Sequence, residues 1–319
     1  MAKLILFTDL DGTLLHPKTY AFDAALPALN LIKEKEIPLI FCSSKTKAEI
    51  EVYRKRLNNT HPFISENGGG IFIPKGYFSE TPSPQPSPAR GEGDSDTSPA
   101  QWRGGKGEGG KYIIITLGKP YAEIRKAFIE IRRKLGIKAK GFGDMVTEEI
   151  AELAGLQLSE AMLSKARDFD EPFIFEEEPP FNSPTPLSPP LVRGELKGGG
   201  RDRGVVEAFL KAIEDSGLHW THGRFYHILG DNDKGKAVKV LKGFFEREYG
   251  RITTIGLGDN LNDLPLLKEV DHPVLVQRGD GSYEERIKLP NLIKAEGIGP
   301  AGWNKAVLSI LADYINPHH

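Results

Sequence analysis

Short apolar runs alternate with segments of helical periodicity at both ends of this chain of 319 residues. Apolar runs typical of strands occupy residues 3–8, 38–42 and 70–74, and helical periodicity covers residues 22–35 and 47–57. Such alternation is typical of a mostly parallel, doubly wound α/β sheet. In these sheets the functional loops lie at the carboxyl ends of the strands. We therefore predict a core of this class, with function carried by the loops that follow its strands.

The middle of the chain carries a different pattern, in which strands and helices are mixed. Strands are predicted at residues 111–117, 172–176 and 224–229, and helices at residues 121–135, 145–153, 159–167 and 205–216. These elements predict an inserted α+β cap domain built from residues 111–178 and 204–229. The core domain is then discontinuous, and consists of residues 1–78 and 230–319.

Two further segments interrupt this organisation. Residues 79–110 and 179–203 are rich in Pro, Gly and Ser, lack hydrophobic periodicity and resemble each other. Such segments cannot bury enough apolar surface to offset the entropy lost on ordering, so we expect both to be disordered. They are either docking or lid elements or inserts that the surface tolerates, and their composition favours tolerated inserts.

Composition narrows the class of partner. The formal net charge of −2 argues against binding of nucleic acid or of an anionic membrane surface. No apolar run approaches the roughly 20 residues of a membrane-spanning helix, and Asp9 interrupts the N-terminal apolar stretch, which speaks against a signal peptide. The single cysteine, Cys42, excludes an internal disulfide and fits a reducing cytoplasm. We expect a cytoplasmic protein with a small-molecule ligand, and the sequence leaves its oligomeric state open.

The most informative motif is FTDLDGTLL at residues 7–15, an apolar strand that runs into two aspartates. Side chains two apart on a strand point the same way, so Asp9 and Asp11 can converge at the strand end. Gly12 allows the chain to turn away immediately afterwards. Two carboxylates that face one space repel each other unless a cation lies between them, which predicts a hard, oxygen-liganded metal ion such as Mg²⁺. For this motif alone, an acidic turn without a metal is the alternative.

Three more polar motifs follow along the chain. The run LIFCSSK at residues 39–45 ends a strand in Ser43, Ser44 and Lys45. The run DNDKGKA at residues 231–237 places Lys234 at the start of a helical pattern. The run RITTIGLGDNLNDLPLL at residues 251–267 ends a strand in a loop that contains Asp259, Asn262 and Asp263. Together with the first motif, this order resembles that of the haloacid dehalogenase-like phosphohydrolases, over most of the chain outside the two inserts.

The resemblance implies a Rossmann-like catalytic core and a role in catalysis for three residues. Asp9 is expected to attack phosphorus and form an aspartyl-phosphate. Asp11 is expected to protonate the leaving oxygen and then to deprotonate the incoming water. Lys234 is expected to stabilise the charge on the transferring phosphoryl group, with Lys236 and Lys45 as alternatives.

The same resemblance implies a metal site and a phosphate site. Mg²⁺ is expected to bind Asp9, the main-chain carbonyl of Asp11, and Asp259. Asp263 either joins this metal site or caps the helix that follows it. Ser43, with nearby backbone amides, is expected to bind the phosphate oxygens.

Longer segments are similar to the mannosyl-3-phosphoglycerate phosphatases within this superfamily. They are CSSKT at residues 42–46, SENGGG at 65–70, GRFYHILGDNDKGKAV at 223–238 and GIGPAGWNKAVL at 297–308. This similarity implies hydrolysis of 2-O-mannosyl-3-phosphoglycerate to mannosylglycerate, a compatible solute, and phosphate. One alternative is another sugar-phosphate phosphatase, for glucosyl-3-phosphoglycerate or sucrose phosphate, because the cap selects the leaving group. A second alternative, a catalytically silent binding protein, has no need of the complete set Asp9, Asp11, Lys234 and Asp259.

A substrate that carries a sugar, a carboxylate and a phosphate needs cations beyond the phosphate site. Arg167 and Arg224 of the cap are candidates, because a guanidinium forms a planar fork with a carboxylate. The alternative is two exposed arginines without a ligand. Asn67 and Gly68 either offer amides and close backbone approach to the glycosyl part or form a tight turn. The predicted substrate contacts also include Ser44, Lys45 and Asn262.

Overall fold

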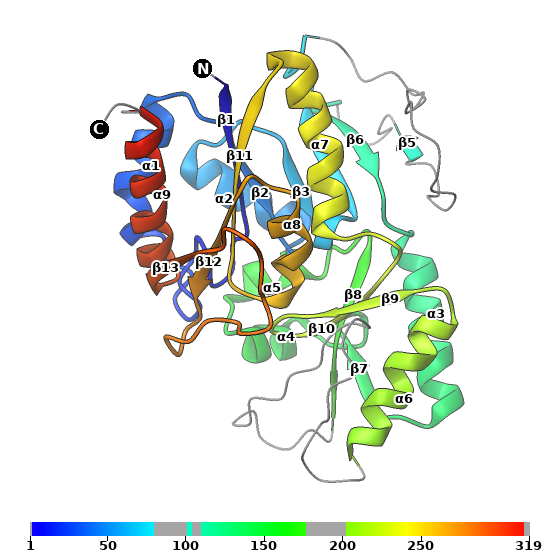
Figure 1. The fold of residues 1–319 in the computed structure, drawn as a ribbon. Coiled ribbons are helices and arrows are strands. Elements are labelled where there is room, and N and C mark those ends of the chain that lie inside the picture. Colours follow the sequence, from blue (N-terminus) through cyan, green and yellow to red (C-terminus); the bar gives the residue numbers. More distant parts are fainter. Residues whose placement is uncertain (1, 80–100, 104–109, 177–201, 316–319) are drawn as a thin grey trace.

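The computed structural model describes residues 2–79, 101–103, 110–176 and 202–315, and contains two sheets with their helices (Figure 1). The large sheet is formed by both ends of the chain, and the small sheet belongs to the inserted cap. The doubly wound α/β class predicted for the core is confirmed. Most of the two Pro- and Gly-rich segments, for which disorder is predicted, lies outside the described residues.

Within the described ranges the large sheet has nine strands, in the order β13-β12-β11-β1-β2-β3-β4-β6-β5. The run from β13 to β3 is parallel, and β4, β6 and β5 extend it as antiparallel strands. The parallel strands are β1 Lys3–Thr8, β2 Leu39–Cys42, β3 Phe63–Ser65, β11 Ile252–Gly258, β12 His272–Gln277 and β13 Ile293–Ile298. The antiparallel strands are β4 Gly70–Pro74, β5 Gln101–Arg103 and β6 Tyr112–Thr116.

The central position of β1 follows from its side chains, which are apolar on both faces. Leu4 and Leu6 pack into one core and Ile5 and Phe7 into the other, as alternation along a strand requires. The first core lies under α1 Leu26–Glu34, α2 Lys47–Leu57 and α9 Pro300–Ile315. The second lies under α7 Lys234–Tyr249 and α8 Leu264–Lys268. Helices on both faces therefore bury the end of β1, where the first acidic motif begins (Figure 1).

The cap contains an antiparallel sheet of four strands among the described residues, in the order β7-β8-β10-β9. Their bounds are β7 Ala139–Gly141, β8 Asp170–Phe175, β9 His219–His222 and β10 Tyr226–Leu229. Two helices, α3 Tyr121–Leu135 and α6 Asp202–Asp215, cover this sheet through a cluster that includes Phe128, Phe173 and Phe209. Two shorter helices, α4 Thr147–Ala154 and α5 Leu158–Ser164, lie toward the core, where Thr46 donates its hydroxyl hydrogen bond to the Leu163 carbonyl at 3.0 Å.

The position of β6 corrects the cap boundary predicted from the sequence. The strand predicted at residues 111–117 was expected in the cap, but β6 pairs antiparallel with β4 in the large sheet. Its buried residues Tyr112 and Ile115 belong to the two core clusters. An edge strand of either sheet has the same alternating pattern, so sequence periodicity could not distinguish the two positions. The strands that were not predicted from the sequence include β5, β7, β9, β12 and β13.

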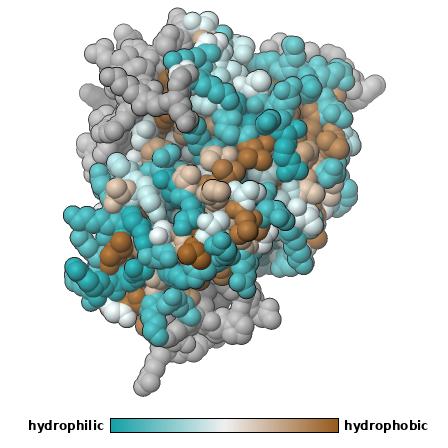
Figure 2. Space-filling model, turned by 180° about the vertical axis from the view of Figure 1, so that it is seen from behind, coloured by the Kyte–Doolittle hydropathy of each residue, from teal (hydrophilic) through white to brown (hydrophobic). Residues whose placement is uncertain are grey.

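The surface opposite the view of Figure 1 is hydrophilic over most of its area, with apolar residues in small groups (Figure 2). Exposed large apolar side chains in the cap include Val146, Leu158 and Met162. Within the described ranges, no helix combines the length and the apolar character of a membrane span.

Candidate active site

Asp9 and Asp11 follow directly after β1, at the carboxyl edge of the large sheet. The chain turns at Gly12 with φ of +80°, a conformation that glycine adopts without strain. A Cβ atom on Gly12 would lie 2.6 Å from Asp259 Oδ2, so glycine also permits close approach of the loop after β11. Thr13 secures this approach by donating a hydrogen bond from its hydroxyl to Asp259 Oδ1 at 2.7 Å. The two acidic motifs therefore meet at one point.

Three carboxylates and one ammonium group are buried together at this point. One oxygen from each of Asp9, Asp259 and Asp263 lies within 4.8 Å of the others. Lys234, the first residue of α7, is fully buried. Its Nζ donates to Oδ1 of Asp9 and to Oδ1 of Asp263, each at 2.6 Å. The fold thus joins the first, third and fourth motifs in one cluster.

The negative charges of the cluster outnumber its positive charge, and the pKa values reflect this. Burial raises the pKa of Asp9 to about 7, with repulsion from Asp263 and Asp11 adding to the shift and Lys234 opposing it. Burial, followed by repulsion from Asp263 and Asp9, raises the pKa of Asp259 well above its ordinary value. A divalent cation would relieve this repulsion, and carboxylate oxygens are the ligands that Mg²⁺ prefers. Asp9 and Asp259 therefore fit a magnesium site.

Asp263 is engaged on both of its oxygens. Oδ1 pairs with Lys234, and Oδ2 accepts from the backbone N–H groups of Asp259 at 3.0 Å and Asn260 at 3.1 Å. Asp263 makes no capping hydrogen bond to α8 itself, but its carboxylate completes a capping box with Asn260 at the 3₁₀ turn Leu261–Asp263, which leads into α8. Asp263 also holds the loop that carries Asp259. Direct metal binding by Asp263 stays a prediction.

Asp11 has a separate ionic partner. Its Oδ2 lies 3.0 Å from Nζ of Lys45, which also reaches Oε1 of Glu49 at 3.4 Å. Burial disfavours the Lys45 ammonium, but Asp11 and Glu49 outweigh burial and raise the pKa of Lys45. Oδ1 of Asp11 is buried and has no hydrogen-bond partner among the described residues. Lys45 therefore neutralises Asp11, whereas Lys234 is the lysine that contacts Asp9.

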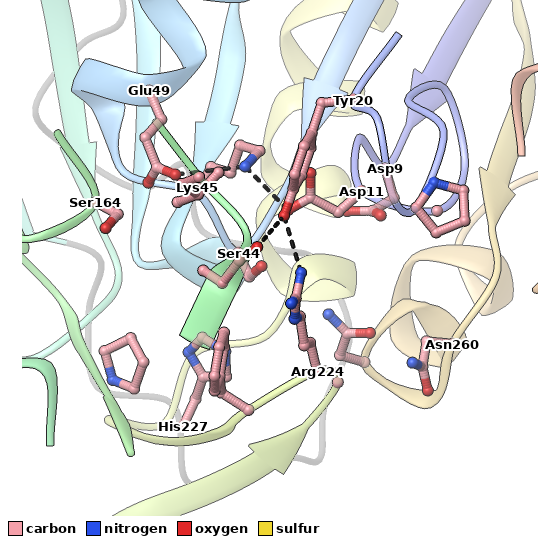
Figure 3. A pocket seen from close by; sticks show the side chains of 18 of the residues that line it. Asp9, Asp11, Tyr20, Ser44, Lys45, Glu49, Ser164, Arg224, His227 and Asn260 are labelled. Atoms are coloured by element: carbon pink, nitrogen blue, oxygen red, sulfur yellow. Dashed lines mark hydrogen bonds and ion pairs between the residues drawn. The ribbon is translucent and has the colours of Figure 1, made fainter. Parts of the chain in front are cut away.

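A cavity of about 450 Å³ lies between core and cap, with Asp9 in its wall (Figure 3). This volume lies within the range typical of small-molecule sites, roughly 300–1,000 Å³. Core residues of the wall include Asp9, Asp11, Tyr20, Lys45 and Glu49, and cap residues include Phe142, Leu156, Arg167, Arg224 and Phe225. Because both parts contribute, a ligand is enclosed only while the cap lies against the core.

Most, but not all, of the predicted site residues line this cavity. Those in its wall are Asp9, Asp11, Ser44, Lys45, Arg167, Arg224, Asp259 and Asn262. Those outside its wall are Ser43, Asn67, Gly68, Lys234 and Asp263. Ser43 is fully buried, and its Oγ accepts from the backbone N–H of Lys45 at 3.3 Å. Its predicted contact with phosphate stays a prediction.

The loop at residues 65–70, predicted to meet the glycosyl part or to turn tightly, is the joint between core and cap. Asn67 Nδ2 donates to Asp170 Oδ2 of the cap at 3.1 Å, and the Asn67 Oδ1 atom accepts from Asn262 at 3.3 Å. A Cβ atom on Gly68 would lie 2.0 Å from the carbonyl oxygen of Asp233, which precedes α7. Both residues therefore lie in a tight turn at Glu66–Gly68 that packs against Asp170 and Asp233, which agrees with the turn alternative. Their contact with a substrate stays a prediction.

Glu66, which is not among the site residues predicted from the sequence, anchors this joint. Its side chain is fully buried and accepts from the backbone N–H groups of Asp168, Phe169 and Asp170 at 2.7–3.1 Å. Burial, followed by the charge of Asp170, raises the pKa of Glu66 to about 8. Glu66 and Asn67 also have φ of +47° and +52°, a conformation that costs roughly 1–3 kcal/mol per residue outside glycine. The strain is tolerated because these bonds hold the cap against the core.

We expect the Glu66→Ala variant to lose about 2–4 kcal/mol of unfolding free energy, because several buried N–H groups lose their acceptor. Glu66→Gln is the matched control, since its amide oxygen can still accept in place of one carboxylate oxygen, and it should lose clearly less. Urea unfolding measures both values. An alanine variant as stable as the unaltered chain would show that water replaces the carboxylate without cost.

The two predicted arginines differ in how their charge is used. The side chain of Arg167 is 5% exposed, and its Nη1 donates to Asp170 Oδ1 at 2.8 Å, so its charge is neutralised within the protein. Arg224 is exposed, and its guanidinium donates to the Tyr20 hydroxyl at 3.0 Å and the Leu153 carbonyl at 2.9 Å. Both acceptors are neutral, and no carboxylate among the described residues pairs with Arg224. Its charge therefore remains available to an anionic ligand.

Several residues of the cavity wall carry no recognisable signal in the sequence. Tyr20 and Glu49 come from the core, and His227 of the cap lies 2.9 Å from Asp170 through its Nδ1 atom. Glu49 completes a capping box with Thr46 at the start of α2, and this role alone accounts for a glutamate at that position. Tyr20 follows the first motif in a loop without periodicity. Only the folded chain brings these side chains together.

Comparisons with known sequences agree with this arrangement. The family model of the haloacid dehalogenase-like hydrolases matches residues 6–82. A protein of Methanococcoides burtonii named glucosyl-3-phosphoglycerate/mannosyl-3-phosphoglycerate phosphatase is 44% identical over 97% of each chain. A Persephonella marina protein of the same name is 40% identical over 97% of each chain. Mannosyl-3-phosphoglycerate phosphatase of Pyrococcus horikoshii is 33% identical, over 86% of this chain and 91% of its own.

Solved structures share the fold at much lower identity. A Thermoplasma acidophilum protein matches 98% of this chain and 99% of its own with a TM-score of 0.60 and 14% identity. The sucrose-phosphatase of Synechocystis matches 97% of this chain and 98% of its own with a TM-score of 0.55 and 10% identity. At such identities the likeness concerns the fold alone.

Proposed function

Because the chain belongs to the haloacid dehalogenase-like hydrolases and is a phosphoric monoester hydrolase, we propose that it converts 2-O-mannosyl-3-phosphoglycerate to mannosylglycerate and phosphate. We also propose glucosyl-3-phosphoglycerate as a substrate, since relatives at 44% and 40% identity are named for both esters. The product is a compatible solute, so we place the reaction in solute synthesis in the cytoplasm.

The observation that carries this proposal is the distribution of charge around the cavity. Asp9, with Lys234 behind it, offers a carboxylate nucleophile beside a fixed positive charge. Arg224, in the cap part of the wall, offers a cation without a carboxylate partner among the described residues. A phosphate at Asp9 and a carboxylate at Arg224 match the two anionic groups of a phosphoglycerate. The remaining space, in a cavity of about 450 Å³, is available to the sugar.

In the proposed reaction Asp9 attacks phosphorus, and the bond from phosphorus to the ester oxygen breaks. Asp11 donates a proton to that leaving oxygen, and then takes a proton from the water that attacks the aspartyl-phosphate. This second displacement releases phosphate and restores Asp9. Lys234 opposes the negative charge that accumulates on the phosphoryl oxygens during both transfers.

We propose Mg²⁺ as the cofactor, bound by Asp9, Asp259 and the main-chain carbonyl of Asp11. The ion would neutralise the phosphate and so allow the anionic nucleophile to approach it. The buried excess of carboxylates in the described part of the chain supports this assignment.

The test is phosphate release from a panel of esters, with Mg²⁺ and after EDTA treatment. We expect kcat/KM for the mannosyl and glucosyl esters to exceed that for sucrose phosphate and hexose phosphates by roughly 10²-fold or more, since the cap selects the leaving group. EDTA should abolish turnover and added Mg²⁺ should restore it. Equal rates across the panel would retain the phosphatase chemistry and reject the proposed substrates.

A further inference from the structure

Tyr20 occupies an unusual position in the cavity wall. It lies in the loop between β1 and α1, and its backbone has φ of +55°, a left-handed conformation in which a bulky side chain is strained. The loop holds this conformation through bonds from the Tyr20 N–H to the His16 carbonyl at 2.9 Å and from the His16 N–H to the Ala21 carbonyl at 2.8 Å. The strained backbone directs the tyrosine side chain across the space between core and cap (Figure 3).

The hydroxyl of Tyr20 contacts two groups of the cap. It donates to the carbonyl oxygen of Ala154 at 2.9 Å and accepts from Nη1 of Arg224 at 3.0 Å. Ala154 is the last residue of α4, and carbonyls at a helix end have no partner within the helix. The donor and acceptor capacities of the hydroxyl are thus both used, and its direction is defined. The core therefore sets the position of a cap arginine through one hydroxyl.

Arg224 is the cavity cation best prepared for an anionic ligand. Lys45 and Arg167 are neutralised by carboxylates of the protein. Lys18 also lines the cavity, but among the described residues its ammonium has no contact that would hold it in place. Arg224 is held by two neutral acceptors, so it combines a fixed direction with an uncompensated charge. A guanidinium in this state suits the planar fork of a carboxylate.

The ring of Tyr20 faces the catalytic side of the cavity. Nζ of Lys45 lies 5.2 Å from the ring centroid, within the range of a cation–π contact. The same ammonium lies 3.0 Å from Asp11 Oδ2. Tyr20 consequently spans from the pair Lys45–Asp11 at one end to Arg224 at the other (Figure 3).

We propose that Tyr20 is a positioning residue for substrate selection, which holds Arg224 ready for the carboxylate of the phosphoglycerate group. This inference rests on the proposed function only for the identity of the ester. The contacts of Tyr20 and Arg224 do not depend on the proposed function. The chemical class selected is a phosphate monoester with a neighbouring carboxylate. Tyr20 contributes to binding of that carboxylate. The attack of Asp9 on phosphorus does not involve Tyr20.

Tyr20→Phe is the informative variant, because it removes the hydroxyl and keeps the ring against Lys45. Without its acceptor, Arg224 samples more rotamers and meets the carboxylate less often. We expect KM for the glycosyl-3-phosphoglycerates to rise roughly tenfold, the value of one hydrogen bond to a charged group, with kcat little changed. Tyr53→Phe is the matched control, since Tyr53 also contacts Lys45, at 5.8 Å, but lies outside the cavity wall.

A binding experiment separates this inference from the proposed function. In the Asp9→Asn variant, where turnover is prevented, calorimetry compares the affinities for 3-phosphoglycerate and glycerol 3-phosphate. Glycerol 3-phosphate has a hydroxymethyl group in place of the carboxylate. We expect a preference for 3-phosphoglycerate of roughly tenfold or more, since a charge-assisted bidentate pair is involved. Tyr20→Phe and Arg224→Met should each remove most of this preference, and the double variant should lose no more than the worse single one. Tyr53→Phe should retain it.

The outcomes are distinct. The inference is overturned if the parent shows no preference, if neither ligand binds, or if Tyr20→Phe leaves the preference unchanged. Additive losses in the double variant would also reject the coupling of Tyr20 to Arg224. If the carboxylate preference is lost as expected but the glycosyl esters are not hydrolysed, the inference stands and the proposed substrates fail.

Discussion

The Asp9→Asn variant is expected to release phosphate at least roughly 10⁴-fold more slowly than the unaltered chain while remaining folded. Asparagine matches aspartate in size, so the packing at the end of β1 is retained. Its amide is a poor nucleophile toward phosphorus, so the aspartyl-phosphate on which both displacements depend does not form. The measurement is kcat for the best ester of the panel, with circular dichroism to verify the fold.

Asp11→Asn is the graded comparison for this experiment. It keeps the nucleophile and removes the proton donor, so the expected loss is roughly 10²–10⁴-fold, the usual contribution of general acid–base catalysis. Asp9→Asn should therefore turn over the ester clearly more slowly than Asp11→Asn. If instead Asp9→Asn keeps appreciable activity, a different group attacks phosphorus and the covalent mechanism is rejected.

Asp9→Asn is also expected to change how the stability of the folded chain depends on pH in the absence of metal. Burial raises the pKa of Asp9 in the folded chain from 3.8 to about 7. Between these values the folded chain binds a proton that the unfolded chain has released, so stability falls as the pH rises through this window. Asp9→Asn lacks this contribution. Urea unfolding in EDTA at both ends of the window should show a flatter pH dependence for the variant.

Lys234→Met is expected to remove activity and to lower the free energy of unfolding by about 3–5 kcal/mol, the usual cost of leaving a buried charge unpaired. The ammonium of Lys234 is fully buried between Asp9 and Asp263, 2.6 Å from an oxygen of each. Burial disfavours this charge, but Asp263 and Asp9 outweigh burial and raise the pKa of Lys234. Methionine has a similar length and is apolar, so the variant leaves the buried carboxylates without their cation.

Lys236→Met is the matched control, two residues further along the same helix. Its ammonium is exposed and, among the described residues, pairs with Asp231 alone, so the expected loss is below about 1 kcal/mol, as for surface ion pairs. Urea unfolding and turnover with Mg²⁺ are measured for both variants. A larger effect of Lys236→Met on turnover would assign the phosphoryl charge to Lys236, the alternative that the sequence left open. Saturating Mg²⁺ should recover part of the stability of Lys234→Met, because it binds only the folded chain.

The carboxylate cluster could be predicted because its residues lie at the ends of strands and helices. Asp9 and Asp259 follow strands that pair in parallel, β1 with β11, so their loops emerge at the same edge of the sheet. Lys234 begins a helix that packs on the same sheet. Once the sheet is doubly wound, its topology places these three side chains together without further information.

The contacts that the cap residues and the neighbouring loops make around the cavity, in contrast, could not be predicted from the sequence. Arg167 and Arg224 are equivalent in sequence, but Arg167 pairs with Asp170, whereas Arg224 has only neutral acceptors in the described part of the chain. For Asn67 and Gly68 the sequence left open a contact with the glycosyl part or a tight turn, and the structure places both in a turn that packs against Asp170 and Asp233. The difference depends on which cap surface lies opposite which core loop.

By itself the sequence determined the class of the core, the bounds of elements such as β1, α2 and α3, and the acidic residues at the carboxyl edge of the large sheet. These features depend on local signals, namely the apolar runs of the strands, helical periodicity and the polar motifs that follow the strands. Only the tertiary structure decided that β6 joins the large sheet, that Glu66 anchors the cap and that Tyr20 orients Arg224. The physical reason is that these contacts join residues far apart in the chain, and their energies depend on the packed surfaces rather than on neighbouring residues.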